Sequence, residues 1–189
     1  ALYPVAIALA NLQKIENNSH LNWVRGLVLA GPPAWAVMTE PAKPLQQKLL
    51  WNLLFDSPVG NAFYRYARRE QFLRSFSIRQ LFESAENVDL EWLKMLENGA
   101  EIMTSRHAVF AFLAGFWRKD YAEEIASITQ PTFTIFGERA SGISKPGKTE
   151  PAQQRLATYL DRVPNSQGTI IRGRNVLPYE STQAFVEAI

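Results

Sequence analysis

The stretch from Pro131 to Arg139 constrains the fold more than any other part of the sequence. It reads Pro-Thr-Phe-Thr-Ile-Phe-Gly-Glu-Arg, a short β-branched and aromatic run that stops at a glycine. Such a run is typical of a buried strand in a parallel sheet. In open α/β sheets, ligands bind beyond the carboxyl ends of the strands. We therefore expect functional residues in the loop that begins at Gly137.

Composition narrows the class of protein. The chain has 189 residues, 47% of them hydrophobic, which is enough for one domain with a real core. It has no cysteine and only two histidines, His20 and His107, so disulfides, thiolate chemistry and a multi-histidine metal site are not expected. The net charge of +2 is too small to indicate a nucleic-acid partner. No apolar stretch approaches the roughly 20 residues that span a bilayer. We expect a soluble protein with no metal or cofactor.

Periodicity predicts the elements in order. A helix is predicted over 1–16, and a buried strand over 24–30 that ends at Gly31-Pro32-Pro33. Residues 41–120 show helical periodicity without a strand, and either Asp56 or Ser57 is suited to be an N-cap. The predicted helices of this block cover 45–55, 59–67, 70–82, 89–103 and 106–117. A short helix over 121–128 and the strand over 131–135 follow. The chain then continues with a helix over 151–162 whose Leu156 and Leu160 face inward, a strand over 168–172, a loop over 173–178 and a closing helix over 181–189. This order predicts an α/β fold.

Three strand ends carry a resemblance to a known family. Gly31-Pro32-Pro33, Gly137-Glu138-Arg139 and Gly173 followed by Pro178 and Glu180 resemble, in their order and spacing, the second half of the α/β-hydrolases. Residues 57–65 are similar to cap sequences of bacterial and plastid hydrolase-like proteins. The resemblance implies a partial α/β-hydrolase fold with a mostly parallel sheet and an inserted helical cap. It divides the chain into core residues 1–36, a cap over 37–128 and further core residues over 129–189. It also implies a location in the cytoplasm or the plastid stroma.

Hydrolases of this family divide the chemistry among a serine, a histidine and a carboxylate. The serine attacks from a G-x-S-x-G elbow, the imidazole carries its proton and the carboxylate orients the imidazole. On this resemblance the elbow lies before Ala1. Gly142 to Pro146 comes nearest to that motif within the sequence, but a proline replaces its second glycine, so we interpret it as a loop. We expect the natural protein to be longer by about 100 residues, or a partner chain to complete the sheet.

The positions of the acid and the base are both unusual. The family's aspartate follows Gly-Glu-Arg, where this chain has Ala140. Glu138, two residues earlier, is the alternative acid, and Glu150 is a poorer one. The family's histidine falls at Asn175, or at Val176 if one gap is allowed, and neither side chain can move a proton near neutral pH. His107, at the start of a predicted cap helix, is the remaining candidate base.

Two hypotheses of function follow. The first is a hydrolase of small apolar ester-like substrates with a rearranged triad. The second, which the vacant positions favour, is a non-catalytic hydrolase-like module that binds a small apolar molecule or a protein partner. In both, the expected pocket lining is Pro32 and Trp35 from the first strand end and Phe112 and Phe116 from the cap.

Residues 63–79 interleave aromatic and basic side chains. The simpler interpretation is a set of amphipathic cap helices that turn their aromatics inward and their arginines to water. The alternative is contact with an anionic surface, for which we prefer a membrane to a nucleic acid.

Overall fold

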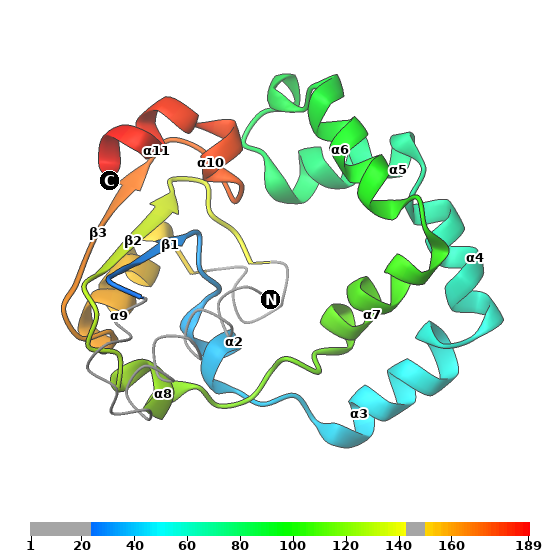
Figure 1. Cartoon of the computed structure of the whole chain (residues 1–189), viewed down its shortest axis with the longest axis horizontal. Helices are drawn as coiled ribbons and strands as arrows, with labels where there is room; N and C mark the ends of the chain where they lie inside the picture. The colour runs from blue at the N-terminus through cyan, green and yellow to red at the C-terminus, as the bar shows by residue number, and fades with distance from the viewer. Residues whose placement is uncertain (1–23, 143–149) are drawn as a thin grey trace. The chain divides into compact units, whose positions relative to one another are not determined.

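The computed structural model describes residues 24–142 and 150–189. The helix predicted over 1–16, His20 and residues 143–149 of the loop lie outside the described residues. The chain divides into two compact units (Figure 1). One comprises Ala1–Glu40 with Lys119–Ile189, and the other is Pro41–Arg118. We call them the α/β unit and the helical unit and describe each by itself.

The α/β unit contains a three-stranded parallel sheet. Its strands are β1 (Leu27–Ala30), β2 (Thr132–Gly137) and β3 (Ser166–Ile171), in the spatial order β1-β2-β3. Thr132 of β2 is opposite Leu27 of β1 and Ser166 of β3. Nearly all of the central strand β2 is buried, as its apolar sequence predicts. The predicted α/β fold class is confirmed.

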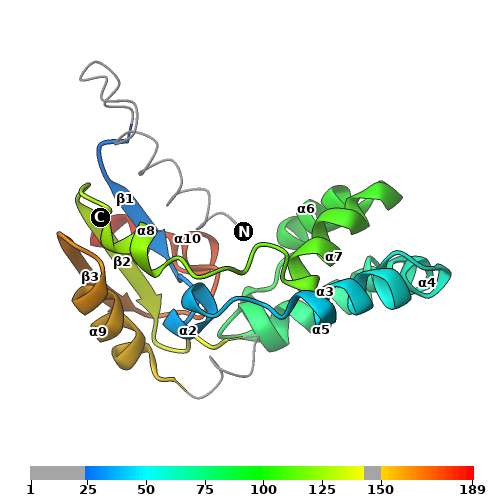
Figure 2. The same ribbon diagram turned by 90° about the horizontal axis from the view of Figure 1, so that it is seen from below.

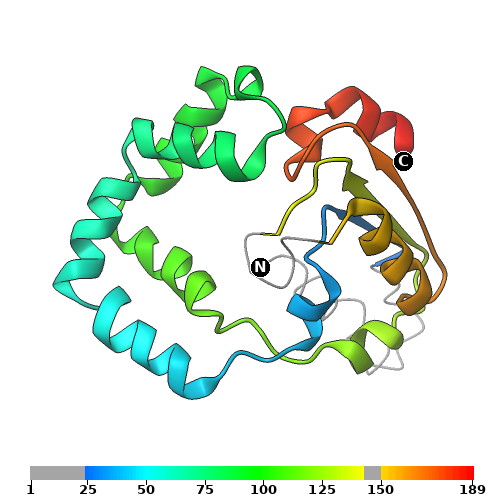
Figure 3. The same ribbon diagram turned by 180° about the vertical axis from the view of Figure 1, so that it is seen from behind.

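Helix α9 (Ala152–Arg162) packs against β2 and β3, on the face of the sheet seen in Figure 3. It buries Ala152, Arg155 and Tyr159. The prediction that Leu160 faces inward is wrong, because this side chain is 40% exposed. The buried face instead follows the i, i+3, i+7 spacing that starts at Ala152. The other helices among the described residues of this unit are α2 (Trp35–Thr39), α8 (Ala122–Ala126), α10 (Leu177–Glu180) and α11 (Thr182–Ala188).

Several boundaries differ from the sequence predictions. Strand β1 begins at Leu27 rather than at residue 24. Strand β3 begins at Ser166, two residues before the predicted start, because the polar Ser166 and Gln167 pair with β2 despite lacking an apolar pattern. Helix α2 was not predicted, and α10 begins inside a predicted loop. Both are too short for periodicity to reveal them.

The helical unit, residues 41–118, contains no strand, as predicted. Its elements are α3 (Pro44–Leu49), η1 (Leu50–Phe55), α4 (Pro58–Ala67), α5 (Glu70–Phe76), η2 (Ser77–Leu81), η3 (Ala85–Asn87), α6 (Leu90–Ala100), η4 (Met103–Ser105) and α7 (Arg106–Ala114). Figure 2 shows α6 and α7 above the layer formed by α3, α4 and α5. Phe55, Tyr64, Phe110 and Ala114 form a buried cluster between the two layers.

Two predicted α-helices of this unit end in π-helical turns, η1 and η2. Their i→i+5 hydrogen bonds run from Asp56 N to Trp51 O at 2.7 Å and from Phe82 N to Ser77 O at 3.0 Å. The Oγ of Ser77 also accepts a buried hydrogen bond of 2.9 Å from Trp92 Nε1. The apolar spacing predicted helical segments here but could not distinguish α from π geometry.

Ser57 is the N-cap of α4, which is one of the two alternatives predicted. Its Oγ accepts a hydrogen bond of 3.3 Å from Gly60 N, and Pro58 occupies the first turn. We expect Ser57→Ala to lower the free energy of unfolding by about 1 kcal/mol, since an unpaired N–H remains at the helix start. Chemical denaturation measures this change. Lys43→Ala is the control, because Lys43 begins α3 without a side-chain hydrogen bond and should change stability by less than about 0.5 kcal/mol. Equal effects of the two variants would contradict the capping role of Ser57.

Among the described residues, no helix is both long and apolar enough to cross a membrane.

Candidate functional site

The carboxyl ends of β1, β2 and β3 bring together the loops that carry the predicted acid and base positions. Glu138 N donates to Ile171 O at 2.9 Å and Arg139 N to Gly173 O at 3.0 Å. The loop after β2 therefore continues along the loop after β3. Gly31, at the end of β1, donates to Ile135 O at 2.7 Å. A Cβ on Gly31 would lie 3.5 Å from the carbonyl oxygen of Asn175, so the β1 end adjoins the same loop.

Asn175, the residue at the histidine position, is hydrogen-bonded to the backbone of Ser141. Its Nδ2 donates to Ser141 O at 3.1 Å, and its Oδ1 accepts from Ser141 N at 3.4 Å. The two bonds use both polar groups of the side-chain amide, much as one strand pairs with another. Asn175 thus connects the loop after β3 to the loop after β2, directly beside Ala140. We call this pair of hydrogen bonds the Asn175–Ser141 clamp.

Arg174 strengthens the same connection. Its Nε and Nη2 donate to Ser141 Oγ at 3.0 and 2.9 Å, and its backbone N donates to Glu180 Oε2 at 2.8 Å. Sequence reasoning did not identify Ser141 or Arg174 as members of the site. Ser141 follows Ala140 and Arg174 precedes Asn175 in the sequence. Their contact joins residues 33 positions apart, so no local sequence pattern could reveal it.

Ala140, at the family's acid position, and Glu138, the alternative acid, both lie just after the end of β2. Ala140 is half-buried and offers only a methyl group. Glu138 is exposed, and its described hydrogen bond is made by its backbone. Their assigned roles stay predictions.

Glu150, the poorer acid candidate, lies beside a buried arginine. Arg155 is 3% exposed, and its Nε donates to Glu150 O at 3.1 Å and lies 3.9 Å from Glu150 Oε2. Burial lowers the pKa of the Arg155 guanidinium from its ordinary value, and the charge of Glu150 opposes that shift. A buried cation needs a counter-charge, so this carboxylate has a structural role. The apolar spacing of α9 could have marked Arg155 as buried.

His107 belongs to the helical unit. It lies in the first turn of α7, half-buried, with its ring centroid 6.0 Å from that of Trp51. Its role as a base stays a prediction.

The four residues expected to line the pocket are divided between the two units. Pro32 and Trp35 belong to the α/β unit, and Phe112 and Phe116 belong to the helical unit. Pro32 is buried, and Trp35 packs edge-on against Tyr159, with centroids 5.6 Å apart. In the helical unit, Phe112 stacks on Trp117 and Phe116 packs 5.3 Å from Trp51. Both phenylalanines remain substantially exposed, which leaves their rings accessible. The role of each as pocket lining stays a prediction.

An open hollow of about 320 Å³ lies elsewhere on the α/β unit. It is lined by Gly26–Val28, Pro131–Phe133, Asn165 and Gln167, near the amino ends of the strands. It therefore does not include the strand ends where the candidate site lies. Among the residues described, no three histidine or acidic side chains converge as metal ligands would.

Comparison with solved structures identifies the fold. The chain is similar to an esterase from Thermogutta terrifontis at 18% identity and a TM-score of 0.59, covering 98% of this chain and 58% of that one. It is similar to a serine hydrolase from Cycloclasticus zankles at 15% identity and a TM-score of 0.56, covering 97% and 58%. A bromoperoxidase from Bacillus anthracis matches at 17% identity and a TM-score of 0.54, covering 87% and 56%. No protein-family model and no curated protein sequence matches the chain.

The described residues therefore have a partial α/β-hydrolase fold, as the resemblance of the strand ends implies. The chain spans less than three fifths of the length of each of these three solved structures.

Proposed function

We propose that this protein uses the α/β-hydrolase fold to bind a small apolar molecule without hydrolysing it. The observation that carries the proposal is the Asn175–Ser141 clamp. The side chain of Asn175, at the expected histidine position, is hydrogen-bonded to the backbone of Ser141 and so holds the two loops together. A binding site benefits from loops fixed in this way, because rigid loops lose less entropy when a ligand binds.

Proton transfer explains why the clamp argues against hydrolysis. The attacking serine must give its proton to a base that is neutral near pH 7, and a carboxamide has no such basicity. The methyl group of Ala140 cannot orient a base either. Because removal of one triad member lowers turnover by orders of magnitude, loss of both partners leaves little of the chemistry.

A second candidate is hydrolysis of small apolar ester-like substrates by a rearranged triad. It is supported by the names of the similar structures, which include esterases and serine hydrolases. In this alternative, Glu138 serves as the acid and His107 as the base. The exposed carboxylate of Glu138 at the strand ends is the specific observation in its favour.

In either case we propose the same binding surface and the same completion of the sheet. Pro32 and Trp35 at the β1 end provide apolar contacts to the ligand from the α/β unit, and the exposed rings of Phe112 and Phe116 are the apolar contacts that the helical unit offers by itself. Among the described strands β1 pairs only with β2, and Val28 of β1 is exposed. We propose that further strands, from the same protein or a partner chain, pair with the other edge of β1.

Labelling with a fluorophosphonate probe tests the choice between the two functions. We expect folded full-length protein to show no labelled serine and no hydrolysis of p-nitrophenyl butyrate above background. Mass mapping of the probe locates any adduct. A stoichiometric adduct on one serine, with turnover lost on Glu138→Gln or His107→Gln, would establish the hydrolase and refute the binding module.

We expect the double variant Ala140→Asp/Asn175→His to gain esterase turnover, by about 100-fold over the unchanged protein, if a nucleophilic serine is present. The variant supplies an acid and a base at the two positions that the resemblance assigns. Ala140→Asp/Asn175→Gln is the matched control, because it disturbs the clamp without adding a base. Equal turnover of the two variants would contradict the assignment of these positions. Circular dichroism confirms that both are folded.

A further inference from the structure

Helix α3 with its continuation η1, and helix α4, carry exposed apolar side chains at helical spacing. Along α3 and η1 these recur every fourth residue, and along α4 they recur at spacings of four and three. The residues are Leu45, Leu49, Leu53, Val59, Phe63 and Tyr66, and each is between 42 and 72% exposed. We call this set the outer stripe. Such spacing places each run on one side of its helix.

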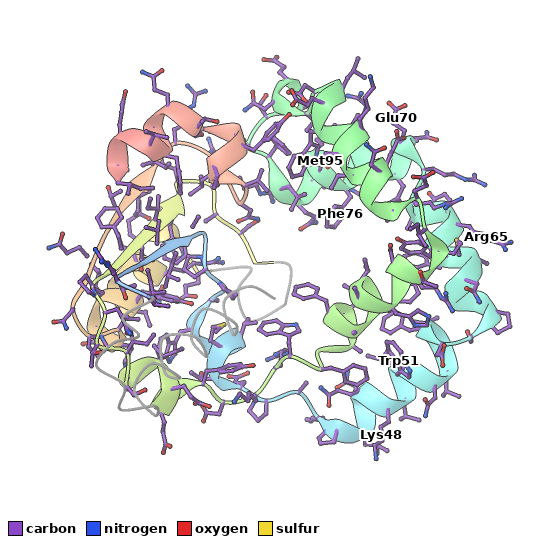
Figure 4. The ribbon with its side chains drawn as sticks, viewed as in Figure 1. Lys48, Trp51, Arg65, Glu70, Phe76 and Met95 are labelled. Carbon is purple, nitrogen blue, oxygen red and sulfur yellow. The ribbon has the colours of Figure 1, made fainter. Side chains whose placement is uncertain are left out.

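The core of the helical unit includes only one residue of the outer stripe, Phe63, whose ring stacks 6.3 Å from that of Phe110. The inner side of the same segments is occupied by Phe55 and Tyr64, whose rings lie 4.7 and 5.9 Å from that of Phe110 of α7. Figure 4 shows Trp51 directed toward α7, whereas Lys48 and Arg65 point away from it. Phe63 and Tyr66 also pack on Phe72, with centroids 6.2 and 5.4 Å apart. The exposed aliphatic residues of the stripe are Leu45, Leu49, Leu53 and Val59.

In the helical unit, the first half of the sequence has a positive net charge and the second half has a negative one. Residues 41–79 contain seven basic and two acidic side chains, for a formal charge of +5. Residues 80–118 contain three basic and six acidic ones, for a formal charge of −3. Lys48 and Arg65 are exposed and belong to the same helical segments as the outer stripe. The Arg69 guanidinium lies 5.9 Å from the ring centroid of Tyr66.

We propose that the outer stripe docks on an anionic membrane surface. Leucine and aromatic side chains would enter the boundary between headgroups and acyl chains, and Lys43, Lys48 and Arg65 would contact lipid phosphates. The combination of exposed apolar residues with an excess of cations favours anionic lipid over a protein partner. The proposed contact region lies closer to the N-terminus than the membrane contact expected over residues 63–79. The reason is that Phe72 and Phe76 are only partly exposed, and Phe72 packs against Tyr66 with ring centroids 5.4 Å apart.

Vesicle co-sedimentation of the full-length protein tests this proposal. We expect binding to phosphatidylcholine vesicles that contain phosphatidylserine, weakened by added salt, and little binding to phosphatidylcholine alone. Lys48→Glu should weaken binding about fivefold or more, since one basic contact is lost and a repulsive charge is gained. Leu53→Glu should weaken it about tenfold, because a charge then enters the apolar contact.

Matched controls lie on α6 of the same unit. Lys94→Glu and Leu90→Glu make the same changes at exposed positions outside the outer stripe and should leave vesicle binding unchanged. Equal losses in the two pairs would overturn the proposal, as would equal binding to neutral vesicles or no binding at all. If instead the protein self-associates and Leu53→Glu abolishes this without any vesicle binding, the outer stripe is a protein interface and the membrane proposal is wrong. None of these outcomes depends on whether the protein hydrolyses esters.

Discussion

Gly137→Ala is expected to destabilise the protein by about 3 kcal/mol, because the added methyl group has no space. A Cβ at this position would overlap the carbonyl oxygen of Gly173 and lie 2.5 Å from that of Arg174. Both obstacles are backbone atoms, so no side chain can swing aside to relieve the clash. The loops that carry Ala140 and Asn175 would have to separate. Chemical denaturation measures the loss.

Gly99→Ala provides the control for this substitution. Gly99 lies within α6, and a Cβ there would meet nothing within 4 Å. Alanine has the higher helix propensity, so we expect this variant to be more stable by up to about 1 kcal/mol. If glycine-to-alanine substitution lowers the free energy of unfolding at position 137 and raises it at position 99, the result would support the close approach of the two loops. A Gly137→Ala variant as stable as the unchanged protein would contradict it.

Phe110→Ala is expected to cost about 4 kcal/mol, because it removes the central ring of the helical unit's core. Phe110 is almost fully buried and stacks on Phe55 at 4.7 Å between centroids. It also contacts the rings of Phe63 and Tyr64, so three aromatic side chains would border the cavity. Urea denaturation followed by near-ultraviolet circular dichroism reports the loss of this aromatic packing.

Phe112→Ala, on the same helix, is the control for Phe110→Ala. Its ring is exposed on one side and stacks only on Trp117 among the described aromatic contacts. We expect a cost of about 1 kcal/mol. Similar costs for the two variants would show that the core is not centred on Phe110.

The sequence predicted those parts of the fold that are governed by apolar patterns. The run from Pro131 became the buried central strand, and the block of helical periodicity became a unit without strands. The short α2 and the polar start of β3 were missed because neither has a repeat long enough to recognise. The π-helical turns were missed because their hydrogen-bond pattern leaves the apolar spacing of so short a segment almost unchanged.

The candidate site was predicted only in part. The glycines that end the predicted strands showed where the two loops begin. The family resemblance then identified Ala140 and Asn175 within these loops. Sequence patterns could not show that Asn175 and Arg174 hold Ser141, because such contacts join residues far apart in the chain and depend on side-chain direction. The burial of Arg155 beside Glu150 was missed for a related reason, since a charged residue is usually assumed to face water.

The Asn175–Ser141 clamp has a consequence for how such a protein can change over generations. A single mutation from asparagine to histidine would break the clamp while gaining no activity, since Ala140 still lacks a carboxylate. A single mutation from alanine to aspartate would add an acid while the histidine position still has no base. Each one-step path toward a complete triad therefore leads through an inactive intermediate, and the path that begins at Asn175 also loses the clamp. If the proposed binding function is right, selection against such intermediates would keep this lineage away from ester hydrolysis.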